Sequence, residues 1–216
     1  MVRRVFVDAI VLAGGRSSRL GSTPKATLIY ERHTLLARTV TAVSSLRRTV
    51  IVGGADPLMC PGQVLVTRED PPYGGPAAGI AAGVAALTAA DSHPSDYIIV
   101  LACDMPLVAT ATEKLIDLLP QYADSDGLIA SDGQRLQPLV AVYKTTKLTS
   151  ALATQRRSGG LDGLSVVRLI ATLNLTPVIA PDGSTDDVDT WVDAARFGIV
   201  APAAQSTTRE KSHDLS

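Results

Sequence analysis

The sequence has few cysteines and no cysteine motif. Its two cysteines, Cys60 and Cys103, lie far apart in the chain, and no CxxC pair or Cys/His group accompanies them. This pattern argues against a structural zinc site and against a disulfide framework. It fits a reducing compartment, so we expect a cytoplasmic protein.

The sequence also has no excess of charge and no long hydrophobic run. Lys and Arg number 20 against 21 for Asp and Glu, a balance that gives no long-range attraction to nucleic acid or to an anionic membrane. No apolar stretch approaches the roughly 18 to 20 residues of a membrane span. The apolar run near the N-terminus contains Asp8 and leads into a glycine turn instead of a cleavage site. We therefore expect neither nucleic acid nor membrane as a partner, and any anionic ligand must be held by local groups.

What the chain does have is an alternation of apolar, β-branched segments with segments of helical spacing. This order predicts an α/β fold in three layers, a mostly parallel twisted sheet with helices on both faces. With 216 residues, 46% of them hydrophobic, we expect a single domain over residues 1–202, with halves at about 1–124 and 125–202 and a disordered tail at 203–216. The expected strands are 6–12, 49–52, 64–67, 97–102, 127–131, 138–143 and 175–179. The expected helices surround 35–46 and 80–87 and cover 147–155, 163–171 and 190–197.

The first strand runs directly into a glycine turn that is followed by cations. Gly14 and Gly15 come after Leu12, and Arg19 and Lys25 follow shortly. Consecutive backbone amides in such a turn form an anion-binding concavity, to which an Arg adds forked donors and a Lys a point charge. These groups could neutralise a triphosphate, the alternative being a tight turn with solvated cations. Neither GxxxxGK[ST] nor GxGxxG is present, so a different kind of nucleotide fold is required.

An acidic residue follows the apolar strand at 97–102. In open α/β sheets, ligands bind beyond the carboxyl ends of the strands, where Asp104 is expected to lie. Mg²⁺ commonly takes one or two carboxylates and leaves positions for phosphate oxygens and water. Asp104 is therefore a candidate magnesium ligand, and the alternative is an Asp that caps the next helix or begins a turn.

The run LAGGRSSRLGSTPKATL and the later CDMP resemble the signature of nucleotidyltransferases that activate sugars and cofactors, and most closely the molybdenum cofactor guanylyltransferase family. The resemblance implies a Rossmann-like nucleotidyltransferase fold, with Asp104 as the metal-binding acid. The chain departs from the family at Pro24, where many relatives have an acidic residue. The nucleotide contacts that the resemblance implies are Leu12, Ala13, Gly14, Gly15 and Lys25.

Three further positions are assigned through the same resemblance. In REDPPYGGPAAG, Asp70 corresponds to an acid that contacts the nucleotide, with Glu69 beside it, and the alternative is a surface loop. Gly53 stands where relatives often carry an amide side chain, so only its backbone is available there. In STDDVDTWVDA, Asp189 is implied as a second metal ligand, and the alternative is an acid that favours a helix N-terminus.

The reaction implied is transfer of GMP from GTP to a phosphorylated acceptor, the pterin cofactor molybdopterin, with release of pyrophosphate. Arg19, Lys25 and Asp104 are the expected catalytic groups, Mg²⁺ is the expected cofactor, and weak contacts with molybdoenzyme maturation proteins are expected. Arg135, Gln137, Arg156 and Arg157 are candidates for the acceptor side or solvated surface groups. The alternatives are a cytidylyltransferase for the same cofactor, a sugar-phosphate nucleotidyltransferase and a nucleotide-binding regulatory module without turnover. The sequence does not determine the acceptor or the oligomeric state.

Overall fold

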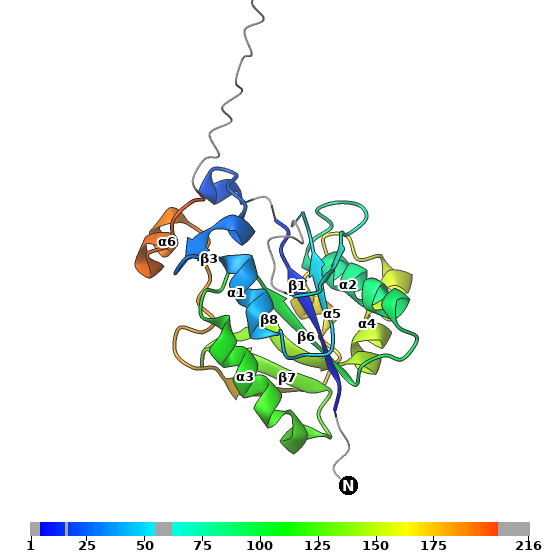
Figure 1. The fold of residues 1–216 in the computed structure, drawn as a ribbon. Helices are drawn as coiled ribbons and strands as arrows, with labels where there is room; N and C mark the ends of the chain where they lie inside the picture. The colour runs from blue at the N-terminus through cyan, green and yellow to red at the C-terminus, as the bar shows by residue number, and fades with distance from the viewer. Residues whose placement is uncertain (1–4, 16, 55–61, 203–216) are drawn as a thin grey trace, which may run out of the picture.

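The computed structural model describes residues 5–15, 17–54 and 62–202, and these contain a seven-stranded sheet of order β5-β4-β1-β6-β8-β7-β9 (Figure 1). Strand β8 runs antiparallel to its neighbours β6 and β7, whereas the other paired strands of this sheet are parallel. The predicted α/β fold with a mostly parallel sheet is thus confirmed. The strands are β1 (Val7–Leu12), β4 (Thr49–Val52), β5 (Leu65–Thr67), β6 (Tyr97–Ala102), β7 (Gly127–Ser131), β8 (Leu136–Lys144) and β9 (Leu175–Ile179).

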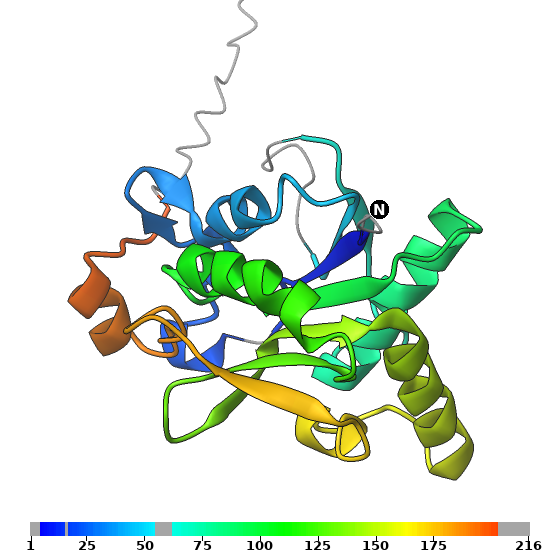
Figure 2. The same ribbon diagram turned by 90° about the horizontal axis from the view of Figure 1, so that it is seen from below.

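Helices cover both faces of the sheet, as the sequence predicts. On one face, α1 (Leu35–Ala42) and α3 (Val108–Leu118) pack against alternate residues of β1 and β6, and Figure 2 shows these two helices together on one side. On the other face lie α2 (Pro76–Ala90), α4 (Thr145–Ser158) and α5 (Val166–Leu169). The central strands β1, β4 and β6 are almost completely buried, which explains their nearly continuous apolar sequence.

A smaller apolar cluster covers the end of the sheet at which β1 finishes. It joins the segment after the glycine turn, the hairpin of β2 (Ile29–Tyr30) and β3 (His33–Thr34), and the late helix α6 (Trp191–Phe197). Ile29 and Val200 exchange two backbone hydrogen bonds of 2.9 and 3.0 Å, which fasten the C-terminal segment to the hairpin. The cluster therefore brings chain that is far away in sequence beside the glycine turn.

Several predicted boundaries differ from the structure. The helix expected at 163–171 is only Val166–Leu169, begun by the Ser165 side chain, which accepts a hydrogen bond from the amide of Arg168. Helix α1 ends at Ala42, before the end of its apolar stripe, and the following residues form turns. The β2–β3 hairpin was not predicted, because two-residue strands carry almost no periodicity. Cys60 and the tail predicted at 203–216 lie outside the described residues.

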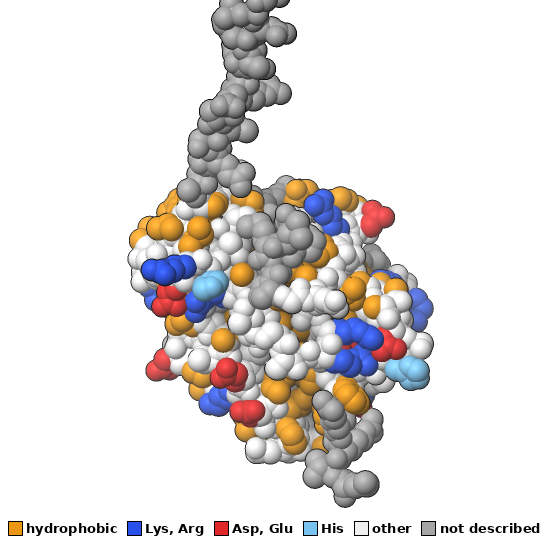
Figure 3. Space-filling model, in the orientation of Figure 1, with side chains coloured by type: hydrophobic (Ala, Val, Ile, Leu, Met, Phe, Trp, Pro, Cys, Tyr) orange, Lys and Arg blue, Asp and Glu red, His pale blue; other side chains and the backbone are white. Residues whose placement is uncertain are grey.

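The surface agrees with the balanced composition. On the face drawn in Figure 3, Lys and Arg side chains are interspersed with Asp and Glu. Among the described residues, no helix has the length and apolar character needed to cross a membrane.

Candidate active site

A cavity of about 560 Å³ opens where β1 and β6 end. Leu12 and Ala102 are register partners that close these two strands, and the amide of Cys103 donates to the carbonyl of Leu12 at 3.1 Å. The turns that follow both strands are thereby held side by side. The cavity is lined by Leu12, Ala13, Gly14, Gly15, Ser17, Ser18, Arg19, Pro24, Lys25, Val52, Glu69, Tyr73, Gly75, Pro76, Gly79, Ala102, Cys103, Asp104, Leu139 and Asp189.

The glycine turn rests on the end of β4. The amide of Ala13 donates to the carbonyl of Val52 at 2.8 Å. A Cβ atom on Gly53 would lie 2.8 Å from the backbone nitrogen of Gly14, and the φ of Gly53 is +137°. Only glycine fits there without displacing the turn. Gly53 lines a second cavity of about 400 Å³, and its own amide donates to Thr67.

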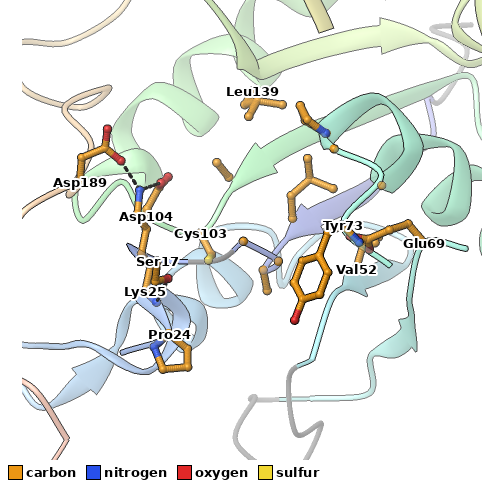
Figure 4. Close-up of a pocket in the computed structure, with 18 of the residues that line it drawn as sticks. Ser17, Pro24, Lys25, Val52, Glu69, Tyr73, Cys103, Asp104, Leu139 and Asp189 are labelled. Atoms are coloured by element: carbon orange, nitrogen blue, oxygen red, sulfur yellow. Dashed lines mark hydrogen bonds and ion pairs between the residues drawn. The ribbon is translucent and has the colours of Figure 1, made fainter. Parts of the chain in front are cut away.

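Lys25 lies between two carboxylates (Figure 4). Its ammonium nitrogen donates to Asp104 Oδ2 at 2.7 Å and also to Asp189 Oδ1. Its position is fixed locally by Ser17, whose hydroxyl accepts a hydrogen bond from the Lys25 amide. Burial by itself would lower the pKa of Lys25, but the charge and hydrogen bond of Asp104, together with Asp189, outweigh it and raise this pKa above its ordinary value. Lys25 is therefore a permanent cation at this site.

The second carboxylate comes from the segment before α6. The amide of Val188 donates to the backbone carbonyl of Asp104 at 3.0 Å, and the Val188 side chain is fully buried. Thr190 caps α6, and Asp193 Oδ2 accepts hydrogen bonds from the amides of Thr190 and Asp189. These contacts hold the late segment against the end of β6 and direct Asp189 toward Lys25.

The same segment contributes a third acidic residue. One carboxylate oxygen from each of Asp104, Asp187 and Asp189 lies within 4.8 Å of the others. The pKa of Asp187 is raised by desolvation and by the charges of Asp104 and Asp189. Our sequence interpretation did not select Asp187 as a ligand, although the two acids flanking the apolar Val188 were a signal for it.

The acidic cluster fits a divalent cation. Asp104 Oδ1 is buried and has no hydrogen-bond partner among the described residues, which leaves a charged oxygen with its bonding capacity unused. Hard carboxylate oxygens are the ligands that Mg²⁺ prefers. Asp104, Asp187 and Asp189 could therefore hold a divalent metal.

Arg19 is more loosely placed than Lys25. It belongs to the short 3-10 helix η1 (Ser18–Leu20), its side chain is 73% exposed, and its Nη1 lies 3.6 Å from Asp189 Oδ2. The buried Leu20 anchors this helix and leaves the guanidinium at the mouth of the cavity. An exposed guanidinium at that point can turn toward an incoming phosphate.

On the far side of the cavity, Glu69 and Tyr73 face the glycine turn. Both residues line both cavities, whereas Asp70 is exposed and is not among the lining residues of either. The assigned nucleotide contact at Asp70 thus lies beside the cavities, and its neighbour Glu69 faces into them. Sequence alone does not separate two adjacent acids, because the loop conformation decides which side chain turns inward.

The candidates for the acceptor side lie elsewhere. Arg135 and Gln137 belong to the β7–β8 hairpin, and Arg156 and Arg157 lie in the last turn of α4. None of the four is among the lining residues of the two cavities. The buried Cys103 lies beside Asp104, and burial raises the pKa of its thiol, which makes it unsuitable as a nucleophile.

Known proteins are similar in sequence to a large part of this chain. Residues 9–171 match the family model described as MobA-like NTP transferase domain. The chain is 31% identical over 137 residues to a probable molybdenum cofactor guanylyltransferase of Clostridium perfringens, and this match covers 63% of the chain and 65% of the relative's length. It is 28% identical over 142 residues to the molybdenum cofactor guanylyltransferase of Shewanella sediminis, covering 64% of the chain and 69% of that protein.

Solved structures show the same fold at lower identity. Molybdopterin-guanine dinucleotide biosynthesis protein A from Archaeoglobus fulgidus superposes with a TM-score of 0.66 at 21% identity, covering 88% of this chain and 96% of that one. A 4-diphosphocytidyl-2C-methyl-D-erythritol synthase from Anaerococcus prevotii gives 0.68 at 11% identity, covering 89% and 94%. The fold is thus shared by a protein named for a guanine nucleotide and a protein named for a cytidine nucleotide.

Proposed function

Because the chain belongs to the MobA-like NTP transferase family, we propose that it transfers GMP from GTP to a phosphorylated acceptor, molybdopterin, and releases pyrophosphate. The observation that carries this proposal is the meeting of Lys25, Asp104 and Asp189 with the glycine turn on one cavity. The cavity joins an anion-binding turn, a cation and a group of carboxylates, which are the parts needed to hold a metal-bound triphosphate.

The reaction is an in-line displacement at the α-phosphorus of GTP. An oxygen of the acceptor phosphate forms the new P–O bond while the bond to the β-phosphate oxygen breaks, and its electron pair leaves with pyrophosphate. The acceptor phosphate is already an anionic nucleophile, so the protein needs no general base. Its contribution is to align the reactants and to stabilise the charge on the oxygens around phosphorus.

Lys25, whose ammonium group lies inside the cavity, stabilises the negative charge on the phosphate oxygens. An ammonium group has three N–H donors, and two of them are used by Asp104 and Asp189. The third can donate to a phosphate oxygen, and Arg19 at the mouth can add forked donors to the outer phosphates. Asp104, Asp187 and Asp189 would hold Mg²⁺, which when bound neutralises the triphosphate oxygens and polarises the reacting phosphate.

Glu69 favours guanine over the other bases. Its carboxylate faces both cavities, away from the Lys25 cluster that we assign to the phosphates. Guanine presents two neighbouring donors, N1–H and the N2 amino group, which a carboxylate can accept together. Adenine and cytosine present a donor beside an acceptor on the corresponding edge, so a carboxylate would be repelled by one of the two atoms. This argument favours GTP over the CTP of the cytidylyltransferase alternative.

The proposal keeps the division predicted from the sequence, a nucleotide half at about 1–124 and an acceptor half at about 125–202. Asp104 comes from the first half, whereas Asp187 and Asp189 come from the second, so the proposed metal lies where the halves meet. A cytoplasmic location and weak contacts with molybdoenzyme maturation proteins belong to the same proposal and rest on the cysteine usage and on the family resemblance.

A pyrophosphate-release assay tests the function. The protein is given GTP, ATP, CTP or UTP with Mg²⁺, with and without molybdopterin, and product formation is followed by chromatography. We expect release only with GTP and acceptor, and a loss of about 10²- to 10³-fold for Asp104→Asn, since one charged ligand is removed from the site. Transfer of CMP at the same rate would contradict the guanine assignment, and an unaffected Asp104→Asn protein would contradict the site.

A further inference from the structure

Tyr73 is an aromatic side chain that the structure places at a strained position on the wall between two cavities. The residue is 63% exposed and its φ is +65°, in the left-handed region that bulky residues rarely adopt. Such backbone strain is retained only when surrounding contacts fix it, and it gathers at functional sites. The exposed ring and the strained backbone together indicate that this loop is shaped to present Tyr73.

Two contacts hold the loop in this shape. The amide of Tyr73 donates to Glu69 Oε1 at 3.2 Å. On the following residue, the carbonyl of Gly74 accepts a hydrogen bond of 2.9 Å from the amide of Gly163, which belongs to the loop before α5. A Cβ atom on Gly74 would approach Ala78 to 3.0 Å, so the loop is also packed tightly against the first turn of α2. The ring is therefore carried by backbone that is fixed on both sides.

The glycine turn lines the same two cavities as Tyr73 and adds no side chains to them. Both cavities contain Gly14 and Gly15 of the glycine turn, which have no side chains, and both contain Tyr73. A cavity lined by an aromatic ring and by a turn without side chains suits a planar group. In Figure 4, Tyr73 lies across the cavity from the Lys25, Asp104 and Asp189 cluster, away from the groups that attract phosphate.

We infer that Tyr73 is a base-stacking residue, whose ring covers the face of the nucleobase against the glycine turn, and that Glu69 positions it through the Tyr73 amide. This inference rests on the proposed function, because it assumes that the triphosphate occupies the Lys25 end of the cavity. Aromatic rings stack on any base, so Tyr73 supplies affinity for the base, and selection among bases is left to hydrogen-bonding groups.

Binding measurements separate the base from the phosphates. We would titrate the full chain with GTP and with inorganic tripolyphosphate, which has the charge but no base, in the presence of Mg²⁺. Loss of one stacked aromatic ring weakens binding by about tenfold in comparable sites. Tyr73→Ala should therefore bind GTP about tenfold more weakly and tripolyphosphate unchanged, and Tyr73→Phe should restore most of the GTP affinity. Tyr122→Ala, at a half-exposed tyrosine that lines neither cavity, is the matched control.

The role of Glu69 is tested by two substitutions. Glu69→Gln retains an oxygen that can accept from the Tyr73 amide, so it should keep the stacking. The stacking is measured in each Glu69 variant as the factor by which Tyr73→Ala lowers the ratio of GTP affinity to tripolyphosphate affinity. Glu69→Ala removes the acceptor, so the factor by which Tyr73→Ala lowers this ratio should fall toward one. An unchanged GTP affinity in Tyr73→Ala overturns the inference, and so does an equal loss for GTP and tripolyphosphate, which would indicate general damage to the site.

Failure of the proposed function has a different signature. A wild-type protein that binds GTP but transfers no GMP to any acceptor would contradict the proposed reaction, while the comparison of Tyr73 variants by binding would still decide the stacking role.

Discussion

Replacement of Lys25 should change metal binding and nucleotide transfer in opposite directions. In this structure its ammonium group is the cation held by Asp104 and Asp189, two of the three carboxylates that we assign to the metal. Lys25→Met keeps a chain of similar length and removes the charge. Without nucleotide, Mg²⁺ then no longer competes with the ammonium for the carboxylates, so its affinity should rise. With nucleotide, a donor to phosphate is missing, so turnover should fall.

The size of the first effect follows from the geometry. Two unit charges about 4 Å apart interact by about 4 kcal/mol at an effective dielectric constant of about 20, and a divalent ion doubles this value to about 8 kcal/mol. The side chains of Lys25 and Asp189 are 21% and 45% exposed, so solvent screening reduces this value, and we take about 1 to 2 kcal/mol. The dissociation constant of Mg²⁺ in the nucleotide-free protein should therefore fall by about five- to thirtyfold. Turnover should fall by about 10²- to 10³-fold, the usual loss for one preorganised charge donor.

Isothermal titration calorimetry with Mg²⁺ or Mn²⁺, without nucleotide, measures the first effect, and the pyrophosphate assay measures the second. Lys147→Met is the matched control, because Lys147 Nζ also pairs with a carboxylate, that of Asp126 at 3.1 Å, but lies outside the cavity. The control should leave both quantities unchanged. An unchanged or weaker metal affinity in Lys25→Met would refute the reasoning, since the ion would then not bind close to the ammonium group.

Three further predictions concern stability and the glycine turn. Asp8 is buried inside β1 and makes a two-pronged ion pair with Arg47 at 2.7 and 2.9 Å, so Asp8→Ala should lower the free energy of unfolding by about 3 kcal/mol in urea denaturation. Asp91 accepts hydrogen bonds that lower its pKa from 3.8 to about 2. Its contribution to stability is thus complete above pH 3.8 and is lost as the pH falls through about 2, which a series of thermal melts should show. Gly53→Ala places a Cβ atom 2.8 Å from the nitrogen of Gly14 and should weaken GTP binding by about tenfold through displacement of the turn.

Each of these predictions has a contrary outcome. The Asp8 argument is wrong if Asp8→Ala unfolds at the same urea concentration as the wild type. For Asp91, the Asp91→Asn protein should lack part of the acid dependence, and identical pH profiles would count against the assignment. For the turn, Gly54→Ala is the control, because the nearest atom to its Cβ, at 3.2 Å, belongs to the flexible end of the Arg68 side chain. Equal effects of the two glycine substitutions would contradict the specific role of Gly53.

The fold class, most strands and the two ends of the candidate site could be predicted from the order of the amino acids. Four strands, 49–52, 97–102, 127–131 and 175–179, were predicted with the bounds that the structure has. A buried strand needs a continuous apolar run, and that run is visible without knowledge of its neighbours. Gly14, Gly15 and Asp104 were identifiable because ligands of open α/β sheets bind just beyond the carboxyl ends of the strands, and Lys25 because it follows the glycine turn.

Local sequence patterns do not show which distant residues share the cavity, and apart from Asp189, expected through the family resemblance, these residues were found from the packing of the folded chain. Asp187 and Asp189 reach Asp104 because Val188 is buried and its amide donates to the Asp104 carbonyl, a contact between two segments that lie far apart in the sequence. Glu69 faces the cavities and Asp70 lies beside them, because the loop between β5 and α2 turns one acid inward. The same loop brings Tyr73 to the two cavities. A local pattern records the type of a side chain, whereas its direction depends on packing against segments that the pattern does not contain.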